Sequence, residues 1–156
     1  MADFGFSLPE TITSIKLPIS HGWHAPEVTN SYPDFTFTGA VKADIFSLGL
    51  ILLWLTKAVT RNAFLGKASS QTQTHAAGTD KSHNDEDLDW FGVAQQVQIH
   101  GIDAPPLRAI LQSLKLLTSE DYVQKIEKFL ALALRHDYNV RIGSCSDLLQ
   151  VLGRSK

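Results

Sequence analysis

The first 42 residues carry no sustained helical pattern of apolar positions. Proline and glycine interrupt them repeatedly, at Pro9, Pro18, Pro26, Pro33, Gly5, Gly22 and Gly39. This pattern is typical of loop with short extended or single-turn pieces. A loop of this length is unusual inside a compact domain, and long loops tend to carry function.

Residues 41–58 differ because they are apolar on nearly every side of a helix, most strongly over residues 45–55. A helix that is apolar all round is a buried core helix, and the length favours helix over strand. The most apolar stretch is about half of the roughly 20 residues that a membrane span needs, and Asp44 and Ser47 interrupt its start. We therefore expect a core helix and no membrane-spanning segment.

Residues 66–87 contain no large apolar side chain. A segment of this kind cannot offset the entropy lost on ordering, so we expect a mobile insertion.

From residue 88 onward apolar residues recur at helical spacing, which predicts a mainly α fold. One helix is expected at about residues 88–99 and a last one at about 145–152, with Ser144 as its N-cap and Asp147 completing a capping-box pattern. Between them, one predicted helix starts at Pro105 and Pro106. The apolar faces of the two middle helices are Leu107, Ile110, Leu111, Leu114 and Leu117 in one, and Val123, Ile126, Phe129, Leu130 and Ala133 in the other.

Composition restricts the function classes. The 156 residues, 44% of them apolar, suffice for one domain with a sizeable core. Fourteen basic residues against sixteen acidic ones give no basic face for nucleic acid. The single cysteine, Cys145, allows no internal disulfide, and the first residues lack a secretory signal, so we expect a reduced, cytoplasmic setting. His75, His83, Asp80 and Asp85 match no compact metal-ligand spacing.

Four short motifs occur in the order in which a known protein family carries them. They are Asp3-Phe4-Gly5, Ala25-Pro26-Glu27, Asp44-Ile45-Phe46-Ser47-Leu48-Gly49, and Arg141 at the end of residues 135–141. In order and spacing they resemble the DFG, APE, D-x-W-S-x-G and final-loop arginine motifs of the C-terminal lobe of a eukaryotic-type protein kinase. Phe46 stands where the family usually has tryptophan. The resemblance implies a partial kinase domain over residues 1–153, with an activation segment at 3–27, the insertion at 66–87 and helices over 88–153.

The resemblance also implies a role for each motif residue. Asp3 corresponds to the magnesium ligand, although an ordinary solvated acid near the terminus is the favoured alternative in this chain. Phe4 and Gly5 complete that motif, and Phe4 packs into the core in the family. Glu27 is expected to form a bidentate, structural ion pair with Arg141. In the family the acid at Asp44 accepts hydrogen bonds from the catalytic-loop backbone; a helix-capping role is the alternative here.

The 156 residues contain no G-x-G-x-x-G loop and no H-R-D motif. The family needs both, together with a strand lysine, to hold ATP and magnesium. We therefore expect no catalytic residue, no bound cofactor and no phosphoryl transfer in this chain alone. Without the catalytic loop and the helix before it, one side of the 45–55 helix should face water, and the isolated chain should be poorly soluble.

Two function classes follow from this. One is a portion of a protein kinase whose complete domain phosphorylates serine or threonine with ATP and magnesium, and whose partner is the missing kinase portion. The other is a pseudokinase-like helical module that binds a protein without catalysis. Ser20 leans the resemblance toward the serine/threonine branch. The candidate phosphorylation sites are Thr11, Thr13, Ser14 and Ser20, with plain loop hydroxyls as the alternative.

Overall fold

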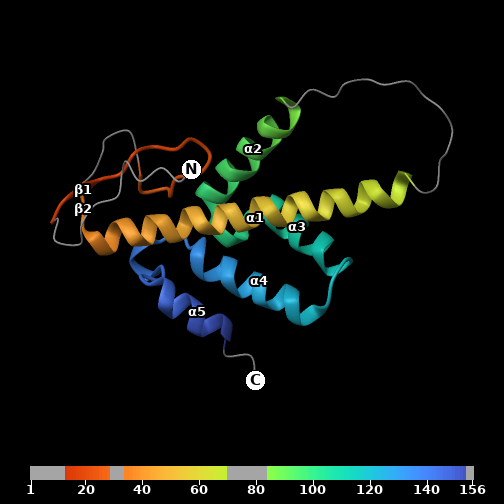
Figure 1. The fold of residues 1–156 in the computed structure, drawn as a ribbon. Coiled ribbons are helices and arrows are strands. Elements are labelled where there is room, and N and C mark those ends of the chain that lie inside the picture. Colours follow the sequence, from red (N-terminus) through yellow and green to blue (C-terminus); the bar gives the residue numbers. More distant parts are fainter. Residues whose placement is uncertain (1–12, 29–33, 70–83, 154–156) are drawn as a thin grey trace, which may run out of the picture.

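The computed structural model describes residues 13–28, 34–69 and 84–153 (Figure 1). Its described part is mainly helical, which confirms the predicted fold class at that level. Asp3, Phe4, Gly5 and Thr11 lie outside the described residues. The elements, in order, are β1 (Ile15–Lys16), β2 (Asp34–Phe35), α1 (Phe37–Ser69), α2 (Asn84–His100), the 3-10 turn η1 (Gly101–Asp103), α3 (Pro105–Lys115), α4 (Glu120–Ala133), the 3-10 turn η2 (Tyr138–Val140) and α5 (Cys145–Gly153).

Helix α1 is the long axis on which the other elements are arranged (Figure 1). It begins directly after Thr36, whose side-chain oxygen accepts a hydrogen bond from the Gly39 backbone N–H at 3.1 Å, an N-cap contact. Helices α3 and α4 pack against it. The predicted helix at 41–58 is therefore present, but it extends at both ends.

The extension corrects the boundaries expected for the mobile insertion. Residues 66–69 are the end of α1 and residues 84–87 are the start of α2, so four residues at each end are helical. Once a helix is nucleated, each further residue adds one hydrogen bond, so a helix can continue into polar sequence beyond its packed part. The middle of the expected insertion, residues 70–83, lies outside the described residues.

The expectation that α1 is buried all round is wrong. One face is fully buried, at Ile45, Phe46, Leu50 and Leu53. The other face is open to solvent, at Leu48, Ile51, Leu55 and Val59. Helices α3 and α4 pack on α1, and the described residues leave this face uncovered.

Residues Phe37–Ala63 of α1 have the length and hydropathy of a membrane span, with 44% of the most apolar window buried inside the protein. Core helices of soluble proteins meet the same two criteria. The expected absence of a membrane span therefore stays a prediction.

The predicted apolar faces of the later helices are confirmed. Leu107, Ile110, Leu111 and Leu114 of α3 are buried, as are Val123, Ile126, Phe129, Leu130 and Ala133 of α4. Leu117 follows the end of α3 and is half-buried. The cap of α5 is also as expected, since the Ser144 hydroxyl accepts a hydrogen bond from the Asp147 N–H at 3.2 Å.

Helix α1 packs tightly at Gly49 against the C-terminal end of α4 and the residue that follows it. A Cβ at this position would lie 2.7 Å from Cδ2 of Leu134 and 3.0 Å from Cβ of Ala133. Glycine is therefore required for the two helices to pack at this distance.

The described part of the N-terminal segment is mostly loop, as predicted. Its regular structure is a two-residue antiparallel ladder that pairs Ile15 with Phe35 and Lys16 with Asp34. The loop between these strands carries Glu27 and packs Val28 and Ala25 into the core.

Candidate functional site

Arg141 and Glu27 form the ion pair that the sequence predicts. Both terminal nitrogens of Arg141 donate to the Glu27 carboxylate, one to each oxygen, with Nη2 to Oε2 at 3.0 Å. Arg141 is 2% exposed, so its charge depends on these partners and not on water. The pair joins the N-terminal loop to the segment between α4 and α5.

Two further N–H groups of Arg141 donate to backbone carbonyls. Its Nε donates to the Arg135 carbonyl at 2.9 Å and its Nη1 to the Lys42 carbonyl at 3.1 Å. The guanidinium carbon lies 4.7 Å from the centre of the Phe46 ring, a cation–π contact. Arg141 therefore contacts the N-terminal loop, α1 and the segment after α4 at the same time, and links these three parts of the chain.

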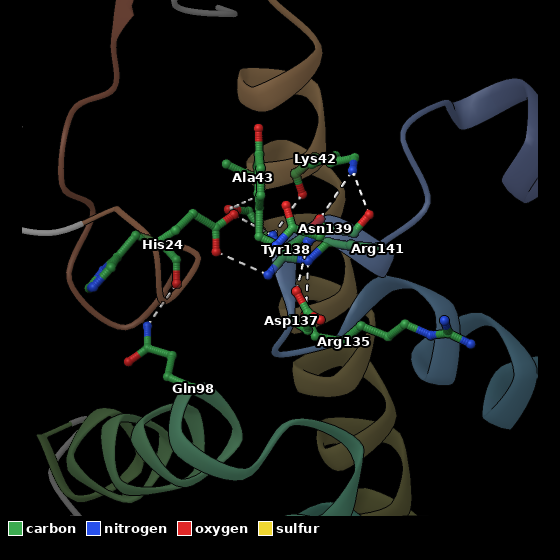
Figure 2. A network of polar contacts seen from close by, with 11 residues as sticks. His24, Lys42, Ala43, Gln98, Arg135, Asp137, Tyr138, Asn139 and Arg141 are labelled. Carbon is green, nitrogen blue, oxygen red and sulfur yellow. Dashed lines mark hydrogen bonds and ion pairs between the residues drawn. The ribbon is translucent and has the colours of Figure 1, made fainter. Parts of the chain in front are cut away.

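Lys42 makes a second link between α1 and the segment after α4, beside Arg141 (Figure 2). The sequence analysis did not predict this link. Its Nζ donates to the carbonyls of Tyr138 and Asn139, each at 3.1 Å, and lies 4.9 Å from the Tyr138 ring centre. A lysine in the second turn of a helix carries no local signal for a contact 96 residues away.

The loop before Glu27 is held against α2. The His24 backbone N–H and its Nδ1 both donate to the Ser20 carbonyl, at 3.1 and 3.0 Å. From α2, the Gln98 side-chain amide donates to the His24 carbonyl at 2.8 Å (Figure 2). Ser20, Thr13 and Ser14 are exposed, and their phosphorylation stays a prediction.

Two hollows adjoin this loop. The larger, about 460 Å³, is lined by Ile19, His21, His24, Pro26, Val28, Gln95, Gln98 and Ile99. The smaller, about 130 Å³, opens between the loop and α1 and is lined by Leu17, Pro18, Ser20, His24, Ala25, Val28, Ala43, Asp44 and Ser47. The polar lining of the larger hollow is imidazole and amide groups, which suit hydrogen bonding more than charge neutralisation.

Asp44 is the charged group in the smaller hollow. Among the described residues no hydrogen bond or ion pair reaches its carboxylate. The alternative of a helix-capping role is wrong, because α1 begins at Phe37 and Asp44 lies inside it. The surrounding protein removes part of its hydration, and this burial raises the pKa of Asp44 above its ordinary value.

Three tryptophan rings lie beside the loop, with Trp23 tilted against Trp90 and edge-to-face with Trp54. Trp23 lies between Trp90, at 5.0 Å between ring centres, and Trp54, at 6.3 Å. The Trp90 Nε1 is buried and has no hydrogen-bond partner in the described part of the chain. Gly22, with φ +78°, allows the turn that brings Trp23 here.

No metal centre is formed within residues 13–28, 34–69 and 84–153, where no three histidine, cysteine or acidic side chains converge. Asp3, the residue that the resemblance gives as a magnesium ligand, lies outside these ranges, as do His75, His83 and Asp80.

No protein family, no curated protein and no solved structure matches the chain. The kinase resemblance therefore stays a prediction from the four sequence motifs.

Proposed function

We propose that this chain is a C-terminal-lobe portion of a protein-kinase-like domain, and that it does not transfer phosphate by itself. The observation that carries the proposal is the bidentate pair between Glu27 and Arg141. Both residues come from motifs selected in the sequence for that pairing, and they are 114 positions apart. Phe46, from a third motif, lies against the guanidinium of Arg141.

The parent activity implied by the resemblance is ATP-dependent phosphorylation of protein serine or threonine. Phosphoryl transfer depends on positioning the phosphates and neutralising their charge with metal ions and cationic groups. The 156 residues contain no glycine-rich loop and no H-R-D motif, and only Asp3 corresponds to a metal ligand. One carboxylate does not supply that positioning, so this chain alone is inactive.

Calorimetry with ATP and magnesium tests the inactive part of the proposal. We expect no binding heat with the wild-type chain or with Asp3→Asn. Micromolar binding that Asp3→Asn removes would contradict the proposal, because it would show that this chain holds the nucleotide through its metal.

A chimera tests the kinase part. An N-terminal lobe and catalytic loop from a serine/threonine kinase are placed directly before Asp3. We expect magnesium-dependent ATP binding that Asp3→Asn weakens. A folded chimera whose ATP binding is the same with aspartate or asparagine at this position would count against the resemblance.

A second candidate function is a non-catalytic, pseudokinase-like module that binds another protein. The observation that favours it is the solvent-exposed apolar face of α1, at Leu48, Ile51, Leu55 and Val59. Soluble monomers rarely expose contiguous apolar surface unless it binds something.

A further inference from the structure

The exposed face of α1 is a continuous stripe. Leu48, Ile51, Leu55 and Val59 are 42%, 44%, 48% and 59% exposed. Their spacing of three or four residues places them on one side of the helix, opposite the buried Phe46 and Leu53 of the same element. We refer to these four residues as the α1 stripe.

Asp44 continues the α1 stripe at its N-terminal end, four residues before Leu48. The distance along the helix from Asp44 to Val59, at the end of the α1 stripe, is about 22 Å at the helical rise of 1.5 Å per residue. Asp44 is at the same time part of the lining of the 130 Å³ hollow between α1 and the loop that carries Ser20. The N-terminal end of the α1 stripe therefore adjoins a hollow whose lining includes the Asp44 carboxylate.

The carboxylate of Asp44 has no polar partner among the described residues; the side chain is solvent-exposed, and the atoms that line the hollow remove part of its hydration, which raises its pKa. A cation that enters the hollow can pair with this carboxylate, and the interaction is modest because water competes for an exposed charge. The α1 stripe is apolar and has an unpaired negative charge at its N-terminal end. A complementary binding partner therefore has an apolar surface with a positive charge at one end.

We propose that the α1 stripe docks an amphipathic helix of another protein, antiparallel to α1, whose apolar side covers the stripe and whose last turn carries an arginine or lysine that pairs with Asp44. Antiparallel packing brings the C-terminal end of the incoming helix to Asp44, and basic residues are favoured at that end by the helix dipole. The long side chain of arginine or lysine enters the hollow. The inference rests on the second candidate function, protein binding, and names the chemistry of its partner.

A second copy of this chain fits less well. Antiparallel self-pairing about Ile51 brings Asp44 opposite Ala58 and Val59, which are apolar. Lys57 and Arg61 are more than about 100° around the helix from the centre of the stripe, at 100° per residue. Self-pairing would therefore cover Asp44 without giving it a cation.

The test uses two synthetic helical peptides labelled with a fluorophore. Both carry leucines at alternating three- and four-residue spacing and differ only in the last turn, where one has arginine and the other glutamate. Fluorescence anisotropy is recorded with wild-type chain, Asp44→Lys, Asp44→Asn and Ile51→Lys, at protein concentrations where light scattering detects no aggregate. Leu116→Gln is the matched control, because Leu116 is 74% exposed in the connection after α3.

We expect the wild-type chain and the Leu116→Gln control to bind the arginine peptide about fivefold more tightly than the glutamate peptide, equivalent to about 1 kcal/mol, because Asp44 is solvent-exposed. Asp44→Lys should reverse this preference, Asp44→Asn should remove it, and Ile51→Lys should weaken both peptides. Circular dichroism verifies that each variant is folded, and Asp44→Asn preserves the test if Asp44→Lys is not.

Equal affinity of the wild-type chain for both peptides would overturn the pairing with Asp44 while leaving protein binding in place. Absence of saturable binding to either peptide would count against both the inference and the protein-binding function. A dimer that forms without peptide and is lost in Ile51→Lys would show that the occupant is a second copy of this chain. Binding of the chain to phosphatidylcholine vesicles would show that the occupant is a lipid surface. Either result would overturn the proposed occupant.

Discussion

Arg141 and Glu27 lie 114 residues apart in sequence and form a bidentate pair in which Arg141 is almost fully buried. The carbonyls of Arg135 and Lys42 and the ring of Phe46 occupy the remaining sides of the guanidinium. A charge that is buried in this way is tolerated only while its partners are present. The N-terminal loop and the helical part are therefore linked energetically through this one side chain.

Glu27→Gln should lower the free energy of unfolding by about 3 kcal/mol, because it leaves the buried Arg141 charge uncompensated. The measurement is urea unfolding followed by circular dichroism. The matched control is Lys125→Gln, which breaks the exposed pair with Asp121 and should change the free energy of unfolding by less than about 0.5 kcal/mol. Equal effects of the two substitutions would contradict the structural role of the pair.

Two glycine positions should respond oppositely to alanine. Gly49→Ala should destabilise the fold by about 1–3 kcal/mol, because its Cβ would meet Leu134 and Ala133 of the neighbouring segment. Gly92, in α2, has no atom within 4 Å of an added Cβ, so Gly92→Ala should stabilise by about 1 kcal/mol through helix propensity. Thermal unfolding of both variants is the measurement. Stabilisation by Gly49→Ala would show that α1 and α4 do not approach as closely as described.

Asp44→Asn should raise the melting temperature of the isolated chain slightly at neutral pH; the effect is small because the side chain is solvent-exposed. The pKa of Asp44 is raised in the folded state, so the folded protein holds the proton more tightly than the unfolded chain does, and its stability falls as pH rises from the ordinary aspartate pKa through the raised value. Above that window the ionised group opposes folding, and asparagine removes the penalty. The advantage of the variant should shrink as pH is lowered toward about 4, near the ordinary pKa. A constant difference between the two proteins at all pH values would argue against desolvation of Asp44.

Much of the helical core could be predicted from the sequence because it depends on local pattern. The apolar faces of α3 and α4 and the Ser144 cap needed only helical spacing and capping chemistry. The pairing of Glu27 with Arg141 is a long-range contact, and it was predictable only because ordered motifs pointed to it.

Other features depend on packing that no local pattern specifies. The apolar composition of residues 45–55 predicts burial on every side, yet which faces are covered depends on the neighbouring elements, and one is open at Ile51. The contacts of Lys42 and the desolvation of Asp44 likewise come from loops distant in sequence. The length of α1 exceeded the prediction because helix propagation continues past the last packed residue.

The central claim, that this chain is a portion of a protein-kinase-like domain, is tested most directly by mass spectrometry of the native protein isolated from its source. We predict an intact mass above the 17.2 kDa of these 156 residues, with peptides that carry a glycine-rich loop and an H-R-D motif and that continue directly into Asp3-Phe4-Gly5. A native protein of 17.2 kDa that is folded, monomeric and free of such peptides would contradict the claim and would leave the non-catalytic binding module as its function.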